Sequence, residues 1–301
     1  MIGIKTIKDL FKQASQNIYG ALFSFGLPLI VALVLAFSLP NIYQSKSVLE
    51  VIQADDANPY SQLAGNFSGV AGILGFSLPG AATDRALYVE SLINSRTLFK
   101  ELIEDADVAH KIFSGKKYDF KKNELIYSKQ TIIKDENLKW KDDLQPTFNE
   151  VYEKFLSQIS VRIDTESRYI ILSYEHPSPF FAKQMLEKLI LEVNENIRTK
   201  DIDETQKSLD FLYLKLNEIN EVEIRNEITS LIQSKLSMLM LTEIKENYVL
   251  DPIEKPFIPE EAHKPSRTLI VIIGFIFGFF LLFSYLFLSK ALYVESKPTR
   301  T

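Results

Sequence analysis

An uncharged apolar segment near the C-terminus, residues 268–288, constrains the fold of this chain more than any other feature. It reads TLIVIIGFIFGFFLLFSYLFL, and as a helix it is long enough to cross a hydrocarbon core of roughly 30 Å. A proline-rich signature leads into it, formed by Pro252, Pro256, Pro259 and Pro265-Ser266-Arg267. Because proline lacks an N–H and has a fixed φ, this signature is predicted to be neither helix nor central strand. We therefore expect a short returning strand over residues 248–250 and then a stiff segment, together within residues 247–267, joined directly to a transmembrane helix.

A second apolar stretch lies near the N-terminus. We predict a transmembrane helix over residues 18–39, because the chain is almost wholly apolar from Leu22 to Leu39. The alternative is a cleaved signal peptide, since Ala36-Phe37-Ser38 resembles a small-x-small cleavage site. The length of the apolar run and of its leader favours the span, and Pro28 is tolerated inside a membrane helix.

Small residues on the two predicted spans indicate a packing site. Gly274 and Gly278 are four residues apart and lie on one helix face. Glycine lets a neighbouring helix approach closely, and the expected partner is the first span through Ala32 and Ala36. The alternatives are contact with another membrane protein, or glycines that are simply common in membrane helices.

The two short tails, residues 1–17 and 289–301, are both net positive. Their basic residues are Lys5, Lys8, Lys12, Lys290, Lys297 and Arg300. The positive-inside rule therefore places both tails in the cytoplasm. The long segment between the spans, in which acidic residues outnumber basic ones, is expected on the other side of the membrane.

The sequence offers no recognisable reactive site. It contains no cysteine, which excludes disulfides and thiolate metal ligands. Its three histidines, His110, His176 and His263, are too far apart in sequence to indicate a His-rich metal site. There is no GxxxxGK[ST] phosphate loop, and no constellation of carboxylates identifies a hydrolase. We expect no enzyme activity, no catalytic or metal-binding residue, no cofactor and no nucleic-acid partner.

Residues 40–178 are predicted to form an α/β base domain, so the expected fold class is α+β. Within it we expect strands over residues 43–53, 159–163 and 169–174, and helices over residues 83–105 and 146–156.

Two further stretches of the base carry no regular pattern. The glycine-rich residues 65–80 predict an adaptable apolar loop that packs on the core or against a membrane-proximal neighbour, rather than a ligand loop. The lysine-rich residues 114–143 also hold many acids, which is typical of a solvated surface, and the alternative is a phosphate-binding surface.

Residues 179–246 are predicted to form a long helical arm, because they contain neither proline after position 179 nor glycine. An apolar stripe lapses between Arg198 and Ser208 and then resumes, so the helix is expected to leave the core and to pack against another helix. The stretch from Asn217 to Glu223 is the expected place for a bend.

This order of segments resembles the Wzz-type polysaccharide chain-length regulators, the polysaccharide co-polymerases of bacterial inner membranes. The resemblance covers nearly the whole chain. It rests on Tyr43-Gln44-Ser45 after the first span, the strand–HPSP–helix passage at 159–189, residues 225–252, the proline-rich signature, and Gly274 with Gly278. Some members carry a kinase domain, but no Walker motif is present here.

The resemblance implies a multi-pass inner-membrane protein with a periplasmic base and arm, assembled as a ring-shaped homo-oligomer in the lipid bilayer. It implies non-enzymatic control of the length of a lipid-linked polysaccharide such as O-antigen, with a membrane polymerase and the lipid-linked glycan as partners. An alternative is a two-span component of capsule export that works with a transporter. Two other classes of function are alternatives to a polysaccharide protein, namely a sensor and an enzyme.

Overall fold

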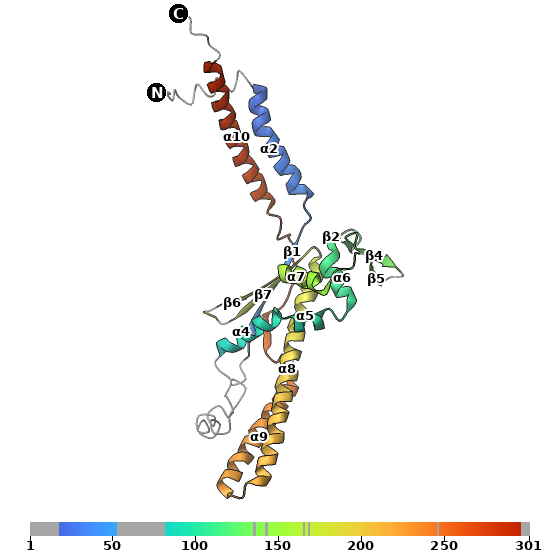
Figure 1. Ribbon diagram of the computed structural model, residues 1–301, viewed down its shortest axis with the longest axis vertical. Coiled ribbons are helices and arrows are strands. Elements are labelled where there is room, and N and C mark those ends of the chain that lie inside the picture. The colour runs from blue at the N-terminus through green and yellow to red at the C-terminus, as the bar shows by residue number, and fades with distance from the viewer. Residues whose placement is uncertain are drawn as a thin grey trace, which may run out of the picture. The chain divides into compact units, whose positions relative to one another are not determined.

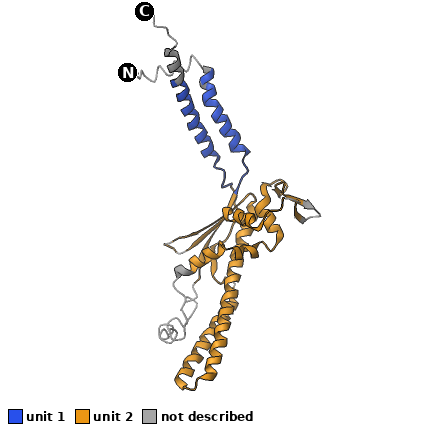
Figure 2. Ribbon diagram, in the orientation of Figure 1, with its two compact units in different colours: residues 1–42, 262–301 blue, residues 43–261 orange. Residues whose placement is uncertain are grey.

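The computed structural model divides the chain into two compact units (Figure 2). Unit 1 consists of Met1–Ile42 and Ala262–Thr301, and unit 2 of Tyr43–Glu261. The residues that the structure describes are 18–52, 82–134, 137–141, 144–164, 166–167, 169–245 and 247–295. The glycine-rich loop predicted at residues 65–80 and the N-terminal tail lie outside this set.

Unit 1 is a pair of apolar helices, α2 (Ile18–Ser38) and α10 (Arg267–Glu295), which lie side by side (Figure 1). Within α10, residues Arg267–Phe287 form the one helical stretch of the described chain that is long and apolar enough to cross a membrane. Leu22–Ser38 within α2 is a shorter apolar helix. The helix predicted over residues 268–288 therefore falls inside α10, whereas a first membrane span over residues 18–39 stays a prediction.

Unit 2 is built on an antiparallel sheet with the strand order β6-β7-β1-β8. Its strands are β6 (Ile159–Ile163), β7 (Ile170–His176), β1 (Tyr43–Val51) and β8 (Leu250–Glu254). The predicted strand at residues 159–163 is confirmed with the same bounds. The register pairs the ends of distant segments, as Tyr43 lies opposite His176 and Leu49 lies opposite Pro252.

The expected extent of β8 was wrong. A strand ending at Leu250 was expected because prolines follow it, but β8 continues through Pro252 to Glu254. Since β8 is an edge strand, a residue that lacks an N–H can be accommodated there without removing a central ladder bond.

In the described part of unit 2, four short helices accompany the sheet, and the longest helix packs on it. The short helices are α4 (Ala82–Ile93), α5 (Arg96–Leu102), α6 (Ala106–Ser114) and α7 (Phe148–Gln158). The core contains large, fully buried side chains from the sheet and the helices, among them Leu49, Phe99, Phe155, Leu172 and Leu186. The apolar faces of these amphipathic elements explain one continuous core.

The single helix predicted over residues 83–105 is wrong, because the chain breaks between α4 and α5. Ser95 is the N-cap of α5, and its hydroxyl accepts a 3.1 Å hydrogen bond from the backbone N–H of Leu98. Serine competes for helix backbone groups in this way, so an apolar stripe alone does not reveal such a break. The sequence predicts Thr83 or Asp84 as the N-cap of this helix, and the side chains of both lie outside the described set.

The lysine-rich stretch after α6 forms two hairpins, where only a solvated surface was expected. The strands are β2 (Gly115–Asp119), β3 (Glu124–Tyr127), β4 (Thr131–Lys134) and β5 (Asn137–Trp140). Each strand is four or five residues long, so mixed charge conceals the alternation that marks a longer strand.

The predicted arm is a helical hairpin of α8 (Pro179–Glu218) and α9 (Val222–Ile244), and α9 folds back along α8 (Figure 1). Ser178 caps α8, and Pro179 occupies its first turn, as the sequence predicts. The bend expected between Asn217 and Glu223 is confirmed as the turn between the helices. Beyond the base, a separate apolar cluster holds the hairpin together, formed by Leu209, Leu212, Ile228 and Ile232.

Candidate functional site

The packing residues predicted in the apolar segments lie at the contact between α2 and α10. A Cβ atom placed on Gly274 would overlap the Cβ of Ala32, and one placed on Gly278 would lie 2.9 Å from the carbonyl oxygen of Phe25. Both glycines therefore allow a backbone approach that a larger residue would prevent. Ala32 is buried and Ala36 is fully buried.

A third glycine contributes to the same contact and was not predicted. A Cβ on Gly20 would overlap the hydroxyl end of Tyr285. Gly20 lies at the start of α2 and Tyr285 near the end of α10, so the two helices run antiparallel. Gly20 lies four residues before Ser24, and this small-xxx-small spacing is the sequence signal that could have found it.

The proline-rich signature is divided between the two units. In unit 2, Pro252 lies in β8, and Pro256 and Pro259 are buried beyond it. In unit 1, Arg267 starts α10 and donates a 2.8 Å hydrogen bond to Oδ1 of Asn41.

Arg267 makes a second contact, and the residue before it starts the helix hydrogen bonds. The Arg267 guanidinium lies 5.4 Å from the ring centroid of Phe37, a cation–π contact. The carbonyl of Ser266 accepts from the N–H of Ile270 at 3.1 Å. The peptide bond between Lys264 and Pro265 is cis, and Lys264 forms a β-bridge with Ile42.

Two buried serines of β1 hold the proline-rich segment beside the sheet. Ser47 Oγ donates to the carbonyl oxygen of Glu254 at 2.6 Å, and Ser45 Oγ donates to that of Phe257 at 2.7 Å. Prolines cannot supply N–H groups for a ladder, and these two hydroxyls attach the segment through its carbonyl oxygens instead. The signal in the sequence was two serines at alternate positions of a strand, on one face of it.

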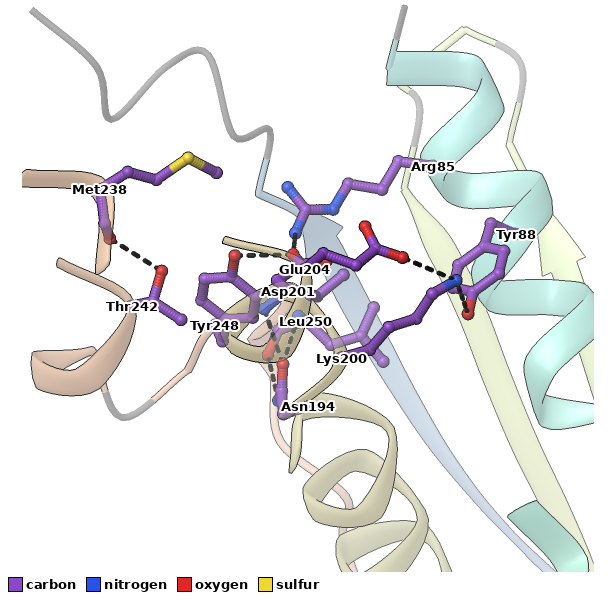
Figure 3. A network of polar contacts seen from close by, with 11 residues as sticks. Arg85, Tyr88, Asn194, Lys200, Asp201, Glu204, Met238, Thr242, Tyr248 and Leu250 are labelled. Atoms are coloured by element: carbon purple, nitrogen blue, oxygen red, sulfur yellow. Dashed lines mark hydrogen bonds and ion pairs between the residues drawn. The ribbon is translucent and has the colours of Figure 1, made fainter. Parts of the chain in front are cut away.

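A polar network joins α8 to the segment that enters β8 (Figure 3). The Asn194 side chain accepts from the backbone N–H groups of Val249 and Leu250 at 2.7 and 2.8 Å. Its amide nitrogen donates to the carbonyl oxygen of Leu250 at 3.0 Å. One buried amide therefore satisfies three main-chain groups at the start of the strand.

The same network reaches α4 (Figure 3). Asp201 Oδ2 accepts from the hydroxyl of Tyr248 at 2.7 Å and lies 3.4 Å from Nη2 of Arg85. The Arg85 guanidinium also lies 5.4 Å from the Tyr248 ring centroid. Lys200, the residue before Asp201, contacts the next turn of α4. Its Nζ donates to the Tyr88 hydroxyl at 3.2 Å. Asn194 and Asp201 were not predicted, although each is a polar residue at or next to the apolar stripe of α8.

A buried histidine fixes the start of α8. Nδ1 of His176 accepts from the backbone N–H of Ser178 at 3.1 Å, and Nε2 lies 2.9 Å from the carbonyl oxygen of Lys111. The neutral ring that carries its proton on Nε2 satisfies both contacts. Burial lowers the pKa of His176 to about 4, because the protonated ring would lose solvation and would lie near Lys154 and Lys111. At neutral pH His176 therefore has a structural role, because its neutral ring joins the main chain at Lys111 to that at Ser178.

A shallow groove of about 490 Å³ lies between α8 and the segment around β8. Its lining mixes acidic, basic and apolar side chains, including Glu187, Glu195, Arg198, Lys255 and the exposed Leu191. Arg198 Nη2 donates to the carbonyl oxygen of Lys245 at the end of α9. This guanidinium therefore caps a helix C-terminus, where a cation is favourable.

Among the described residues, no group of three or more His, Asp or Glu side chains is arranged to hold a metal ion. What the geometry provides within unit 2 is the attachment of a helical hairpin and of the first part of the proline-rich segment to one sheet.

No family model matches the chain, and no curated protein matches it by sequence. Among solved structures, it is similar to a full-length bacterial polysaccharide co-polymerase, with 12% identity and a TM-score of 0.42 over 98% of this chain and 100% of that chain. It is also similar to a fragment of WzzB, a polysaccharide co-polymerase from Salmonella Typhimurium, with 14% identity and a TM-score of 0.33 over 74% of this chain and 100% of the fragment. Both belong to the family that the sequence resembles.

Proposed function

We propose that this protein is a non-enzymatic regulator of the chain length of a lipid-linked surface polysaccharide, such as O-antigen. In this proposal α2 and α10 cross the bacterial inner membrane, both termini are cytoplasmic, and unit 2 is periplasmic. The observation that carries the proposal is that one sheet receives the chain from α2 through β1 and returns it toward α10 through β8. A domain held by both ends is suited to act as a scaffold beside a membrane polymerase.

Assembly into a homo-oligomeric ring is part of the proposal. Large apolar side chains are exposed on the helical hairpin, namely Leu191, Leu214, Val222, Met240 and Ile244. In the proposed ring, neighbouring copies cover these side chains. Mass measurement in detergent and in native membranes tests the assembly, and a monomer in both would contradict it.

The decisive test of the function is deletion of the gene, with the sugar-chain profile resolved on a gel. A regulator predicts that polymer persists while its preferred length is lost, and that the wild-type gene restores that length. Loss of all polymer would instead indicate the alternative role in export with a transporter. Turnover of polysaccharide by the purified protein would overturn the non-enzymatic assignment.

The polymerase partnership needs its own test. We expect the polymerase to co-purify with this protein from membranes that contain both. Less polymerase should co-purify with a variant of this protein in which the contacts of the apolar side chains of α10 are disrupted. Length control that persists when no such complex forms would contradict the partnership.

A further inference from the structure

The β2–β3 hairpin presents positive charge and an aromatic ring at its turn. Lys116 and Lys117 lie on β2 and Lys121 and Lys122 in the turn, and all four are exposed. None of them forms an ion pair with a described residue. Between the two lysine pairs, Phe120 is 58% exposed. The turn therefore combines exposed cations with an exposed apolar ring.

The turn is held in one conformation by its own polar groups. Oδ1 of Asp119 accepts from the backbone N–H groups of Lys121 and Lys122 at 2.9 and 3.4 Å. Asn123 has a φ of 55°, a left-handed conformation that asparagine tolerates better than most residues. The Tyr118 hydroxyl donates to Oδ1 of Asn123. Phe120 and the two turn lysines are therefore presented by a fixed backbone.

A cluster of rings ties this turn to one end of the sheet. Phe120 lies edge-on to Tyr118 and Tyr43, with ring centroids 5.0 and 5.7 Å apart. Tyr118 also contacts Phe180 at the start of α8, at 5.6 Å. Tyr43 is the first residue of β1, so the hairpin lies at the end of the sheet where the chain enters unit 2.

Chain length limits how far this end can lie from α2. Tyr43 follows Ser38, the last residue of α2, by five positions. A fully extended chain spans at most about 3.6 Å per residue, so Tyr43 lies within about 18 Å of the helix end. If α2 spans the membrane, as the proposed function holds, this connection is short enough for the β2–β3 turn to reach the lipid headgroups.

We propose that the β2–β3 hairpin docks on the bilayer surface, with its lysines binding the phosphates of anionic phospholipids and Phe120 entering the headgroup layer. Lysines near an anionic surface each favour binding by about fivefold. Aromatic rings are enriched at the membrane–water interface. This inference rests on the proposed membrane attachment, and it gives the lysine-rich stretch the phosphate-binding role that was the alternative to a plain surface.

Because the chain has no cysteine, one introduced cysteine carries a single fluorescent label. We place it at Glu124→Cys, an exposed position beside the turn, and compare it with Glu223→Cys, an exposed position at the tip of the helical hairpin. α8 has 40 residues and starts at the same end of the sheet, so the tip lies about 60 Å further along that helix. The full-length protein is reconstituted in vesicles that contain a headgroup nitroxide lipid as quencher.

We expect strong quenching at position 124 and little at position 223, with more quenching in phosphatidylglycerol-containing vesicles than in phosphatidylcholine alone. The double variant Lys121→Gln/Lys122→Gln abolishes this lipid preference. The matched control Lys207→Gln/Lys215→Gln, which removes two exposed lysines from the helical hairpin, leaves it unchanged. Salt at about 0.5 M weakens the preference by screening.

Carbonate extraction of the same membranes tests the membrane attachment separately from the docking of the hairpin. A protein that stays in the membrane but shows equal quenching at both positions contradicts hairpin docking and leaves the membrane attachment standing. A protein that is extracted contradicts both. Shielding of position 124 in native membranes but not in pure lipid overturns lipid docking and points to a protein partner.

Discussion

Ser45 Oγ lies 2.7 Å from the carbonyl oxygen of Phe257, a residue 212 positions later in the chain. With the Ser47 hydroxyl on the carbonyl of Glu254, it fixes the proline-rich segment to β1 without any backbone N–H from a proline. The stiff segment predicted from the prolines is therefore attached to the sheet by two side chains of β1.

Ser45→Ala and Ser47→Ala are each expected to lower the free energy of unfolding by about 1–3 kcal/mol, because a carbonyl oxygen loses its donor in a buried place. Urea-dependent pulse proteolysis measures this change. Ser91→Ala, which removes an exposed hydroxyl from α4, is the control and should stay within about 0.5 kcal/mol. Equal effects at positions 45 and 91 would show that the proline-rich segment is held in another way.

The double change Pro256→Ala/Pro259→Ala tests whether the segment acts as a rigid strut. We expect the preferred length of the polysaccharide to change, because the extended conformation loses its fixed φ angles. An unchanged gel profile, with the protein still present at normal levels, would reduce the prolines to a linker.

Gly274→Leu is expected to separate α2 from α10, because overpacking of a close contact costs roughly 1–3 kcal/mol. A cysteine pair at Phe25 and Phe275, whose rings are 5.4 Å apart, reports the contact through oxidative cross-linking. Cross-linking should fall about tenfold with Gly274→Leu. Gly26→Leu is the matched control, since a Cβ there meets nothing within 4 Å. A loss of cross-linking in both variants would contradict a specific contact at Gly274.

His176 should make the protein sensitive to acid. Its folded pKa, about 4, lies below the ordinary pKa of 6.5 for a histidine. The unfolded chain therefore takes up the proton first as the pH falls. The contribution of His176 is complete above pH 6.5 and is lost between pH 6.5 and 4, up to about 3 kcal/mol.

The measurement compares unfolding at pH 7 and pH 4.5 for the wild type, His176→Gln and the exposed control His263→Gln. His176→Gln should lose part of its stability at neutral pH but show a smaller difference between the two pH values. A pH difference as large as that of the wild type would assign the acid sensitivity to other groups.

Asn194→Leu keeps the branched shape of the side chain but leaves two backbone N–H groups and one carbonyl oxygen of residues 249–250 without their partner. We expect a loss of about 2–4 kcal/mol, with faster hydrogen exchange in β8 than elsewhere in the sheet. Asn196→Leu, which removes an amide bonded only to the Glu101 carboxylate, is the control and should cost less. Similar hydrogen exchange in β8 for both variants would contradict the role of Asn194 in holding the start of this strand.

Leu212→Ala should open the helical hairpin while the base stays folded. Leu212 is buried in a cluster separate from the main core, and a Leu→Ala cavity costs about 2–5 kcal/mol. Hydrogen exchange should rise across residues 205–244 and stay unchanged in β1 and β7. The control is Leu214→Ala, which truncates a side chain that is 63% exposed. Uniform exchange throughout unit 2 would mean that hairpin and base unfold together.

The sequence predicts the long elements of this fold well. A helix from Pro179, its capping serine and the turn near position 219 follow from proline placement and apolar spacing, which are local properties. The α4–α5 break and the two small hairpins were missed, because they depend on side-chain hydrogen bonds at Ser95 and on strands too short to show a period. Asn194 and Asp201 were missed for a different reason. Their partners lie about 50 residues away in sequence, and only the antiparallel return of α9 brings them within reach.

The edge of the sheet has one more consequence. β8 is a short outer strand with a proline in its middle and more prolines after it, so it cannot offer the regular row of donors that a strand from another copy would need. The other edge of the sheet is β6, so copies that pair through β6 alone stop at two, and a longer ribbon of joined sheets would need β8. Subunits that meet only through side chains can separate or shift without breaking a main-chain ladder, and their number can be limited by geometry instead of growing without end.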